Sequence, residues 1–171
     1  VVFTPGADAT PPTVSTRFPA AGATNIAGTT TVRATFDEAM NAATIGASTF
    51  ELRDNSNASV AGTVTYDAGT RVATLTPSAN LAAGGVYTAT VRGGATDPRV
   101  KDAAGNAMAA NATWSFTIAP PTPPTIIARS PAPGTTGVAG TANVTATFAI
   151  AMDAATITTS TFVLRDAANA I

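Results

Sequence analysis

The first residues whose types could do chemistry are two adjacent acids, Asp37 and Glu38, which follow an apolar run. Neighbouring carboxylates can bind a metal ion or act as a general acid and a general base. The same segment recurs 112 positions later with Ala149 and Ile150 in their places, and the chain has no histidine or cysteine to complete a site. We therefore interpret Asp37 and Glu38 as exposed carboxylates at a strand end, whose replacement should leave the fold intact.

A second candidate site is the longest polar connection, Gly93–Ala110. Asp97, Asp102 and Asn106 supply the oxygen atoms that calcium prefers, and Gly105 can adopt the left-handed backbone that a tight loop requires. The spacing differs from that of an EF-hand loop, and calcium normally takes six or more oxygens. An Asx-type turn, in which Asp102 accepts backbone N–H groups, is the preferred interpretation. Calcium at these three residues is the alternative, and no other cofactor is expected.

Aromatic side chains suggest a third chemistry, because Trp and Tyr rings can stack on the faces of sugars. Successive residues of a strand point to opposite faces, however, so Trp114 shares a face with Phe116 and Ile118. Because these neighbours are apolar, we expect that face to be buried. The expected structural core residues are Phe36, Phe50, Tyr87, Trp114 and Phe116. Threonines on the opposite faces are typical of exposed strands and do not require an ice- or surface-binding array; they are Thr31, Thr35, Thr63, Thr65, Thr88 and Thr90.

The composition excludes several classes of function. The net charge is −1 and Lys101 is the only lysine, so the chain has no basic cluster for nucleic acid. No apolar run approaches the ~18 residues of a membrane span, so no membrane insertion is expected. The absence of Cys and His excludes disulfides, thiolate zinc sites and Ser-His-Asp triads. The first residues contain no initiator methionine and lack the basic and apolar regions of a signal peptide. We therefore expect the sequence to be a piece of a longer protein.

An internal repeat organises the chain. Residues 11–59 align with residues 123–171 without a gap, and 29 of the 49 positions are identical. Consecutive prolines in residues 119–125 favour a stiff, extended linker. We predict the end of a preceding repeat and a linker in residues 1–10, with a strand at Val1–Thr4; a complete domain in 11–119; a linker in 120–124; and the truncated first half of a second domain in 125–171.

Alternation of apolar and polar residues between Gly- and Pro-rich turns predicts an all-β fold. Seven strands are expected in the complete copy, at Val14–Arg17, Thr30–Phe36, Thr49–Arg53, Val60–Tyr66, Arg71–Thr76, Val86–Arg92 and Ala112–Ile118, with a helical turn only at Asn41–Gly46. Seven short strands in about 110 residues predict an immunoglobulin-like antiparallel β-sandwich, here in tandem. The truncated copy retains strand counterparts at Thr125–Arg129, Thr141–Phe148 and Thr161–Arg165. Without an opposite sheet, these should not form a stable core.

One segment, Leu81–Val91, has the spacing of a tyrosine corner, in which Tyr87 hydrogen-bonds to upstream backbone. The segments PPTVSTRFPAAGATNIAG, TFDEAMN, ATLTPSANL, KDAAGNAM and ATWSFTIA accompany it in order. Together they resemble the bacterial Ig-like domains of the surface-layer (SbsA) type. That family usually carries an acid before the Met, which Glu38 supplies and Ile150 does not.

The resemblance implies a non-catalytic structural spacer in a tandem-repeat, exported or cell-surface bacterial protein. Its partners would be the neighbouring domains of the same chain, and any glycan or protein ligand is unidentified. The alternative function is an adhesive or carbohydrate-binding module stabilised by calcium. An enzyme is not expected.

Overall fold

The computed structural model describes residues 6–171, so the strand expected at Val1–Thr4 lies outside the described residues. The chain divides into two compact units, the first ending at Pro121 and the second spanning Thr122–Ile171. Each unit is described by itself.

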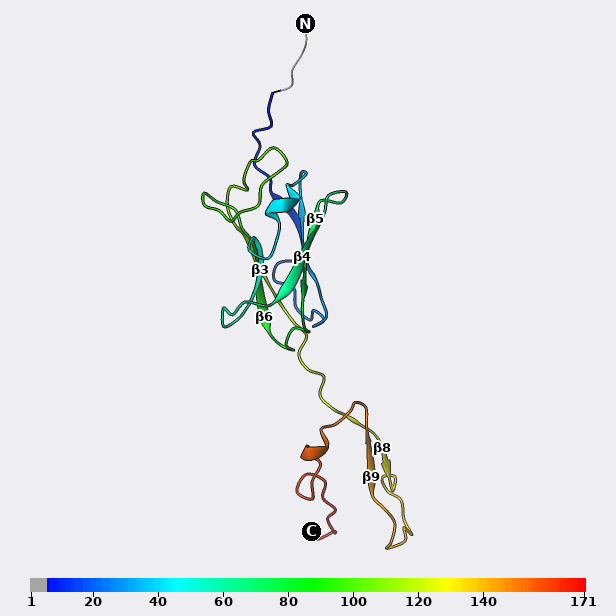
Figure 1. The fold of residues 1–171 in the computed structure, drawn as a ribbon. Coiled ribbons are helices and arrows are strands. Elements are labelled where there is room, and N and C mark those ends of the chain that lie inside the picture. The colour runs from blue at the N-terminus through cyan, green and yellow to red at the C-terminus, as the bar shows by residue number, and fades with distance from the viewer. Residues whose placement is uncertain (1–5) are drawn as a thin grey trace. The chain divides into compact units, whose positions relative to one another are not determined.

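The first unit is an all-β sandwich, as the alternation predicts (Figure 1). Its strands are β1 (Val14–Phe18), β2 (Val32–Phe36), β3 (Phe50–Asp54), β4 (Gly62–Asp67), β5 (Val72–Pro77), β6 (Val86–Val91) and β7 (Ala112–Thr117). They form an antiparallel sheet of order β1-β2-β5-β4 and a second of order β3-β6-β7. This is the strand arrangement of a constant-type immunoglobulin domain. The one described helix of this unit is η1 (Ala42–Thr44), inside the predicted helical turn.

Two strands, β2 and β4, begin two residues later than the alternation predicts, because the first residues of the predicted strands use their backbone N–H groups elsewhere. The N–H of Thr30 donates to Ala27 in a turn, so β2 begins at Val32. The N–H of Val60 donates to Leu52 of β3, in the other sheet, so β4 begins at Gly62. Residue 60 therefore links the two layers before the chain joins the β1-β2-β5-β4 sheet.

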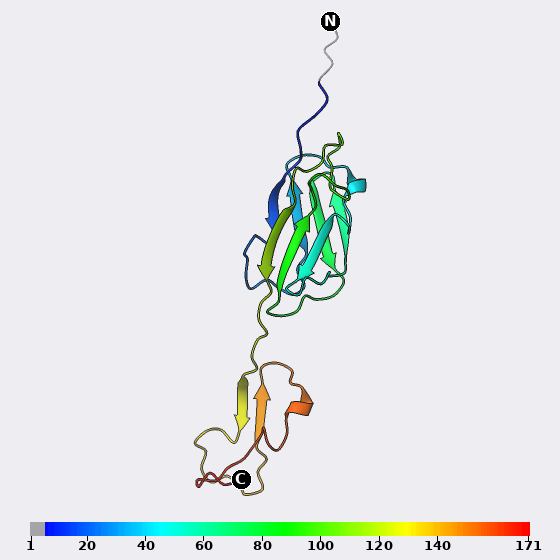
Figure 2. The same cartoon turned by 90° about the vertical axis from the view of Figure 1, so that its left-hand side faces the viewer.

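The core lies between the two sheets, which Figure 1 shows from the side as two layers and Figure 2 shows one in front of the other. β2 contributes alternate residues to it, and β3, β6 and β7 contribute theirs from the opposite side. The aromatic members of the core are Phe36, Phe50, Tyr87, Trp114 and Phe116. Since the inward positions of one face are apolar, a one-residue slip of any strand would expose them, and this fixes the register.

The second unit repeats the beginning of the first. β8 (Ile126–Ser130) and β9 (Thr145–Phe148) pair antiparallel, and η2 (Ala154–Thr156) follows. The register is that of β1 and β2, with an irregularity at the corresponding place: Ile126 lies opposite Phe148 as Val14 lies opposite Phe36. Neither of the described helices, each three residues long, has the length or apolar character to cross a membrane.

The prediction of a third strand in the second unit, Thr161–Arg165, is wrong: this segment is turn and irregular backbone. Its counterpart β3 pairs with β6 along its whole length, from Phe50 opposite Val91 to Asp54 opposite Tyr87. The second unit contains no counterpart of β6, so the segment has no strand to pair with. The strand predicted at residues 141–148 is also shorter than expected, because only residues 145–148 pair with β8.

Candidate functional site

Three carboxylates meet at the end of the first unit where residues 6–12 join the sandwich. We call Asp8, Glu38 and Asp102 the acidic cluster; one oxygen of each lies within 4.8 Å of the others. Asp8 is exposed, Glu38 is half-buried and Asp102 is fully buried. Among the described residues this is the group with the spacing of metal ligands, and its oxygens are of the kind that calcium or magnesium prefers.

Asp102 is held by the turn that the sequence predicts around it. Its carboxylate accepts hydrogen bonds from the backbone N–H and the side-chain amide of Asn106, both at 2.8 Å. Gly105 supplies the left-handed backbone of this turn, with φ of +98°. Burial acts to raise the pKa of Asp102, but the hydrogen bonds from Asn106 and from the backbone of Gly105 and Ala104 outweigh it. The pKa is therefore lowered, and Asp102 is a buried anion.

The pKa of Glu38 is shifted in the opposite direction, upward. Burial raises its pKa first, and the negative charges of Asp8, Asp102 and Asp37 raise it further. A carboxylate at this position is repelled by its neighbours, and a bound cation would relieve the repulsion. The cluster supplies three carboxylates, fewer than the six or more oxygens that calcium normally takes.

Of the three sequence-predicted calcium ligands, the structure brings together Asp102 and Asn106 but does not place Asp97 with them. Asp97 instead forms ion pairs with Arg99 and Lys101, both at 3.2 Å. Its pKa is lowered, first by the hydrogen bond from Lys101. The carboxylates that do approach Asp102 come from distant segments, which spacing within one loop cannot reveal. Glu38, interpreted from the sequence as an exposed strand end, is one of them.

Asp37 also differs from that interpretation, because it binds a specific partner although it is exposed. Its carboxylate accepts hydrogen bonds from the backbone N–H of Thr13 at 2.8 Å and from the Thr13 hydroxyl at 2.7 Å. Its backbone carbonyl accepts from Arg71 at 2.6 Å. The following turn is capped by Asn41, whose side chain accepts from the N–H of Ala43. Asp37 therefore fastens the segment before β1 to the end of β2.

Two tyrosine hydroxyls accept hydrogen bonds from backbone N–H groups. Tyr87, on β6, accepts from Ala82 at 2.8 Å, which is the geometry of a tyrosine corner. Tyr66, on β4, accepts from Met40 at 3.0 Å. No local spacing in the sequence signals the role of Tyr66, because its partner is 26 residues away.

Trp114 lies in the core and is 4% exposed, so its ring offers no face for a sugar. It packs against Phe50 with ring centroids 6.0 Å apart. The guanidinium of Arg17 lies 5.8 Å from the indole centroid. The indole N–H has no hydrogen-bond partner within the described part of the chain. Trp114 is thus a packing residue.

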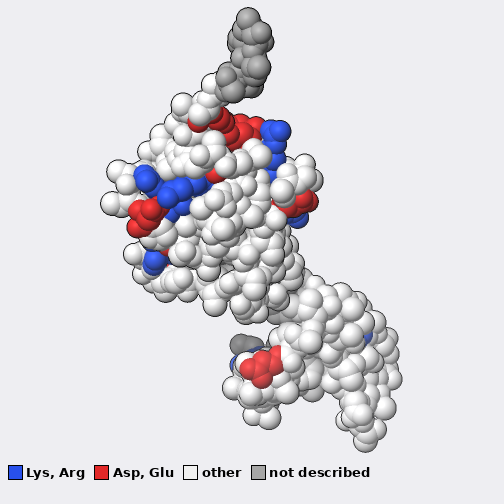
Figure 3. Space-filling model, turned by 45° about the horizontal axis from the view of Figure 1, so that its top comes forward, with Lys and Arg blue, Asp and Glu red and all other residues white. Residues whose placement is uncertain are grey.

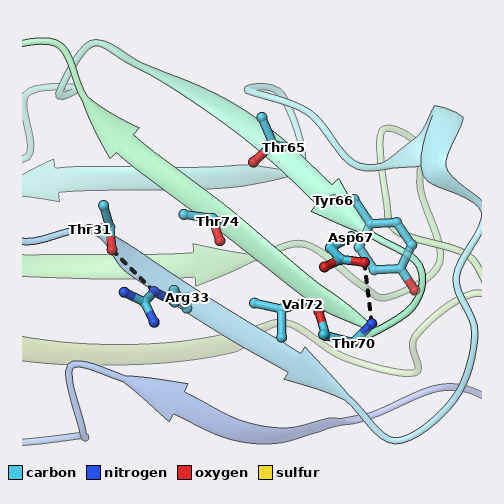
Figure 4. Close-up of a pocket in the computed structure, with 8 residues that line it drawn as sticks. All are labelled: Thr31, Arg33, Thr65, Tyr66, Asp67, Thr70, Val72 and Thr74. Atoms are coloured by element: carbon cyan, nitrogen blue, oxygen red, sulfur yellow. Dashed lines mark hydrogen bonds between the residues drawn. The ribbon is translucent and has the colours of Figure 1, made fainter.

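An open depression of about 620 Å³ lies on the outer face of the β1-β2-β5-β4 sheet (Figure 4). Its lining includes Thr65 and Thr74, and Thr31 accepts a hydrogen bond from Arg33 at 3.2 Å. Asp67, the one acid in the lining, accepts from the N–H groups of Gly69 and Thr70 in a turn. Asp67 is held in this turn, and none of the eight lining residues is a histidine, a cysteine or a lysine.

Charged side chains are sparse and of mixed sign on the face seen in Figure 3. Basic and acidic groups lie beside one another there, and the coloured residues form no continuous basic surface. Elsewhere in the described residues, Glu51 of β3 contacts Arg53 at 3.2 Å and Arg92, the residue after β6, at 2.6 Å.

Comparison with known proteins gives a family and several similar folds. The family model of the bacterial Ig-like domain matches residues 8–118 and 120–171. CopC from Methylosinus trichosporium OB3b is 19% identical with a TM-score of 0.53, over 66% of this chain and 97% of CopC. PcoC, a methionine-rich copper resistance protein from Escherichia coli, is 18% identical with a TM-score of 0.50, over 64% of this chain and 99% of PcoC.

The N-terminal part of the bacterial S-layer protein SbsC is 24% identical with a TM-score of 0.49. The match covers 69% of this chain but 26% of that one, so this chain spans about a quarter of the S-layer fragment. No curated protein sequence matches significantly. At these identities, CopC and PcoC show a shared fold and nothing about ligands.

Proposed function

The chain belongs to the bacterial Ig-like domain family, and from this premise we propose that its first unit is a non-catalytic structural spacer. One observation carries the proposal: the polypeptide reaches the sandwich at one end and leaves it at the opposite end, as both views of the fold show (Figures 1 and 2). A module connected in this way adds its own length between whatever precedes it and whatever follows it.

Both ends are fastened to the sandwich by hydrogen bonds. At the first end, the carbonyl of Asp8 accepts from the side chain of Asn106 at 3.1 Å, and Thr13 is bound by Asp37. At the other end, the N–H of Ala119 donates to Ile26 at 2.8 Å, and the carbonyl of Ala119 accepts from Gly84 at 3.0 Å. Such contacts transmit a load into the folded unit.

The chemistry of the side chains supports a non-catalytic role. The chain contains no histidine and no cysteine, and the carboxylates of Asp37, Asp97 and Asp102 already bind protein donors. A copper role like that of PcoC finds no support in the composition, since the chain has three methionines and two of them, Met40 and Met108, are buried in the core.

The narrower part of the proposal is that this spacer is of the surface-layer (SbsA) type and works in an exported or cell-surface protein. Its partners are then neighbouring domains of the same polypeptide, joined in tandem. The two family matches, to residues 8–118 and 120–171, and the repeat of residues 11–59 support a tandem arrangement.

Single-molecule pulling on residues 6–121 tests the proposal. A spacer should unfold in one cooperative step, releasing at most about 3.5 Å per unfolded residue. Gradual extension without a rupture step would contradict it.

A glycan array and a calcium titration test the rival, an adhesive or carbohydrate-binding module. The spacer predicts no glycan bound and a melting temperature that is equal in millimolar calcium and in chelator, since a ligand that binds only the native state would raise it. Saturable glycan binding would favour the rival.

A further inference from the structure

Two segments of the first unit that are far apart in the sequence are joined side by side. We call residues 22–26 the entry segment, and residues 115–119, the end of β7 and the two residues after it, the exit segment. Ile26 and Ile118 form a parallel bridge between them. Four backbone hydrogen bonds join the segments: Gly22 N–H to Ser115 at 2.8 Å, Thr117 N–H to Ala23 at 2.8 Å, Ile26 N–H to Thr117 at 3.1 Å, and Ala119 N–H to Ile26 at 2.8 Å.

The exit segment is bonded on two sides at once. Its odd-numbered residues bond to the entry segment, whereas the N–H of Ile118 donates to Gly85, the residue before β6, at 2.9 Å. Ile118 is 2% exposed and Ile26 packs against the core, so apolar side chains shield the bridge from water. A hydrogen bond is stronger in such surroundings than in water.

The direction of the two segments decides how they carry a load. β1 and β7, the blue and yellow-green arrows of Figure 2, both run from the end where the chain enters toward the end where it leaves. The parallel bridge shows that the entry segment runs with β7. When the two ends of the unit are pulled apart, the entry segment is drawn toward one end and the exit segment toward the other. Because the hydrogen bonds of a sheet cross between strands, all four are then sheared together instead of opening one after another.

We propose, on the basis of the spacer function proposed above, that the pairing of the entry and exit segments is a mechanical clamp. It sets the rate at which the first unit unfolds when its two ends are pulled apart. A sandwich with the same stability but without this pairing would open strand by strand at a lower load, since forced unfolding is governed by the unfolding barrier and not by the free energy of unfolding.

The pairing of β1 with β2 lies between the pulled end and the clamp, and it detaches first. β1 has five residues, four of them exposed, and its register with β2 is irregular. β7 pairs with β6 at six positions and buries Trp114 and Phe116, so the exit side is held more firmly. After β1 has detached, the clamp still joins the two pulled segments. The hydrogen bonds between Thr13 and Asp37 belong to the β1 side and therefore add to thermal stability without setting the unfolding rate under load.

Constant-force pulling on the whole chain tests the clamp. Handles are attached through Ala9→Cys and Thr125→Cys, at exposed positions of a chain that has no other cysteine. Ala119→Pro removes the N–H that donates to Ile26 and keeps the carbonyl that accepts from Gly84. It should raise the unfolding rate of the first unit at a fixed load about tenfold.

Two control variants accompany it. Thr122→Pro adds a proline to the same linker, but the N–H of Thr122 donates no hydrogen bond within the described residues, so the rate should not change. Asp37→Ala lowers thermal stability but should change the rate under load by less than about twofold, because β1 detaches before the clamp.

A second pulling direction tests the clamp without altering it. β3 and β7 both pair antiparallel with β6, so the loop after β3 lies at the end where the chain leaves. Handles at Ser56→Cys, in that loop, and Thr125→Cys peel the exit segment away from Ala119 onward, one hydrogen bond at a time. At the same load the first unit should unfold at least about tenfold faster in this direction.

Faster unfolding with Ala119→Pro alone, together with weaker resistance in the second direction, supports the clamp. If Ala119→Pro does not fold, the comparison of the two directions decides. Equal rates in both directions, or Asp37→Ala acting as strongly as Ala119→Pro, overturns the clamp. A single cooperative step in that case leaves the spacer standing, whereas gradual extension of the parent contradicts the spacer itself.

Discussion

The Asp37 carboxylate binds Thr13 through two hydrogen bonds, one from the backbone N–H at 2.8 Å and one from the hydroxyl at 2.7 Å. The N–H of Asp37 returns a third bond to the carbonyl of Thr13 at 3.1 Å. In the second unit Ala149 replaces the acid, and only the backbone bond to Thr125 remains, at 2.9 Å. The second unit thus keeps the backbone hydrogen bond at this corner but lacks the two side-chain hydrogen bonds.

Asp37→Ala should destabilise the first unit by about 0.5–1 kcal/mol, a modest value because the pair is exposed to solvent. The pKa of Asp37 is lowered: burial opposes this shift, but the hydrogen bonds from Thr13 outweigh it. Stabilisation by the charge is therefore present above the ordinary value of 3.8 and is lost as the pH falls through the lowered pKa. Thermal melts of the variant and the parent from pH 7 to pH 2 should converge at the acid end. A constant difference would contradict the assignment.

Glu38→Gln should have the opposite effect and raise the melting temperature at pH 7. Burial and the charges of Asp8, Asp102 and Asp37 raise the pKa of Glu38, so its ionised form costs stability above that pKa. The gain should disappear below the ordinary value of 4.5, where the carboxyl is protonated in both the folded and unfolded states. A loss of stability at pH 7 would show that Glu38 has a favourable partner. Replacing both acids together combines the two opposing effects on stability, so the net change in melting temperature should be small.

Tyr87→Phe should lower the stability of the first unit by about 1 kcal/mol, because the N–H of Ala82 loses its acceptor. The ring contact with Phe116, at a centroid distance of 6.1 Å, is retained in the variant. Denaturant unfolding monitored by Trp114 fluorescence measures the change. An unchanged midpoint would mean that water replaces the hydroxyl at no cost.

Asp102→Ala should be the most destabilising of these changes, at about 2–3 kcal/mol, since it leaves buried donors of the turn without an acceptor. Asp102→Asn, which keeps one acceptor oxygen, should cost less. The pKa of Asp102 is lowered, so the stabilisation should persist at neutral pH and be lost only below the ordinary value of 3.8. Chemical denaturation at pH 7 and pH 3 measures the cost of Asp102→Ala and its dependence on pH. Equal stability of the Ala variant and the parent at pH 7 would contradict the prediction.

Limited proteolysis should cut the second unit first. Two paired strands with an uncovered apolar face bury too little surface to offset a backbone entropy of roughly 1–2 kcal/mol per ordered residue. We expect cleavage to begin after Pro124 and to leave a resistant fragment that ends near Ala119. Equal resistance of both units in the isolated chain would indicate that the exposed apolar side chains of the second unit, Phe162 and Leu164 among them, have found a partner.

The sequence by itself determined the all-β class, the seven strands of the first unit and their inward faces. These features are local: alternation at period two and Gly- or Pro-rich turns are written in consecutive residues. The inward positions of Tyr87, Trp114 and Phe116 follow from the same alternation, and the structure buries all three. The repeat at 112 positions likewise needs only comparison of the chain with itself.

Only the tertiary structure decided which carboxylates meet. Asp8 precedes β1, Glu38 follows β2, and Asp102 lies in the loop between β6 and β7. The fold brings these three segments together at one end of the sandwich. It also decided that Asp97 pairs with Arg99 and Lys101. The same reason governs residues 161–165: their sequence favours a strand, but a strand forms only beside a partner, and in the second unit that partner is missing.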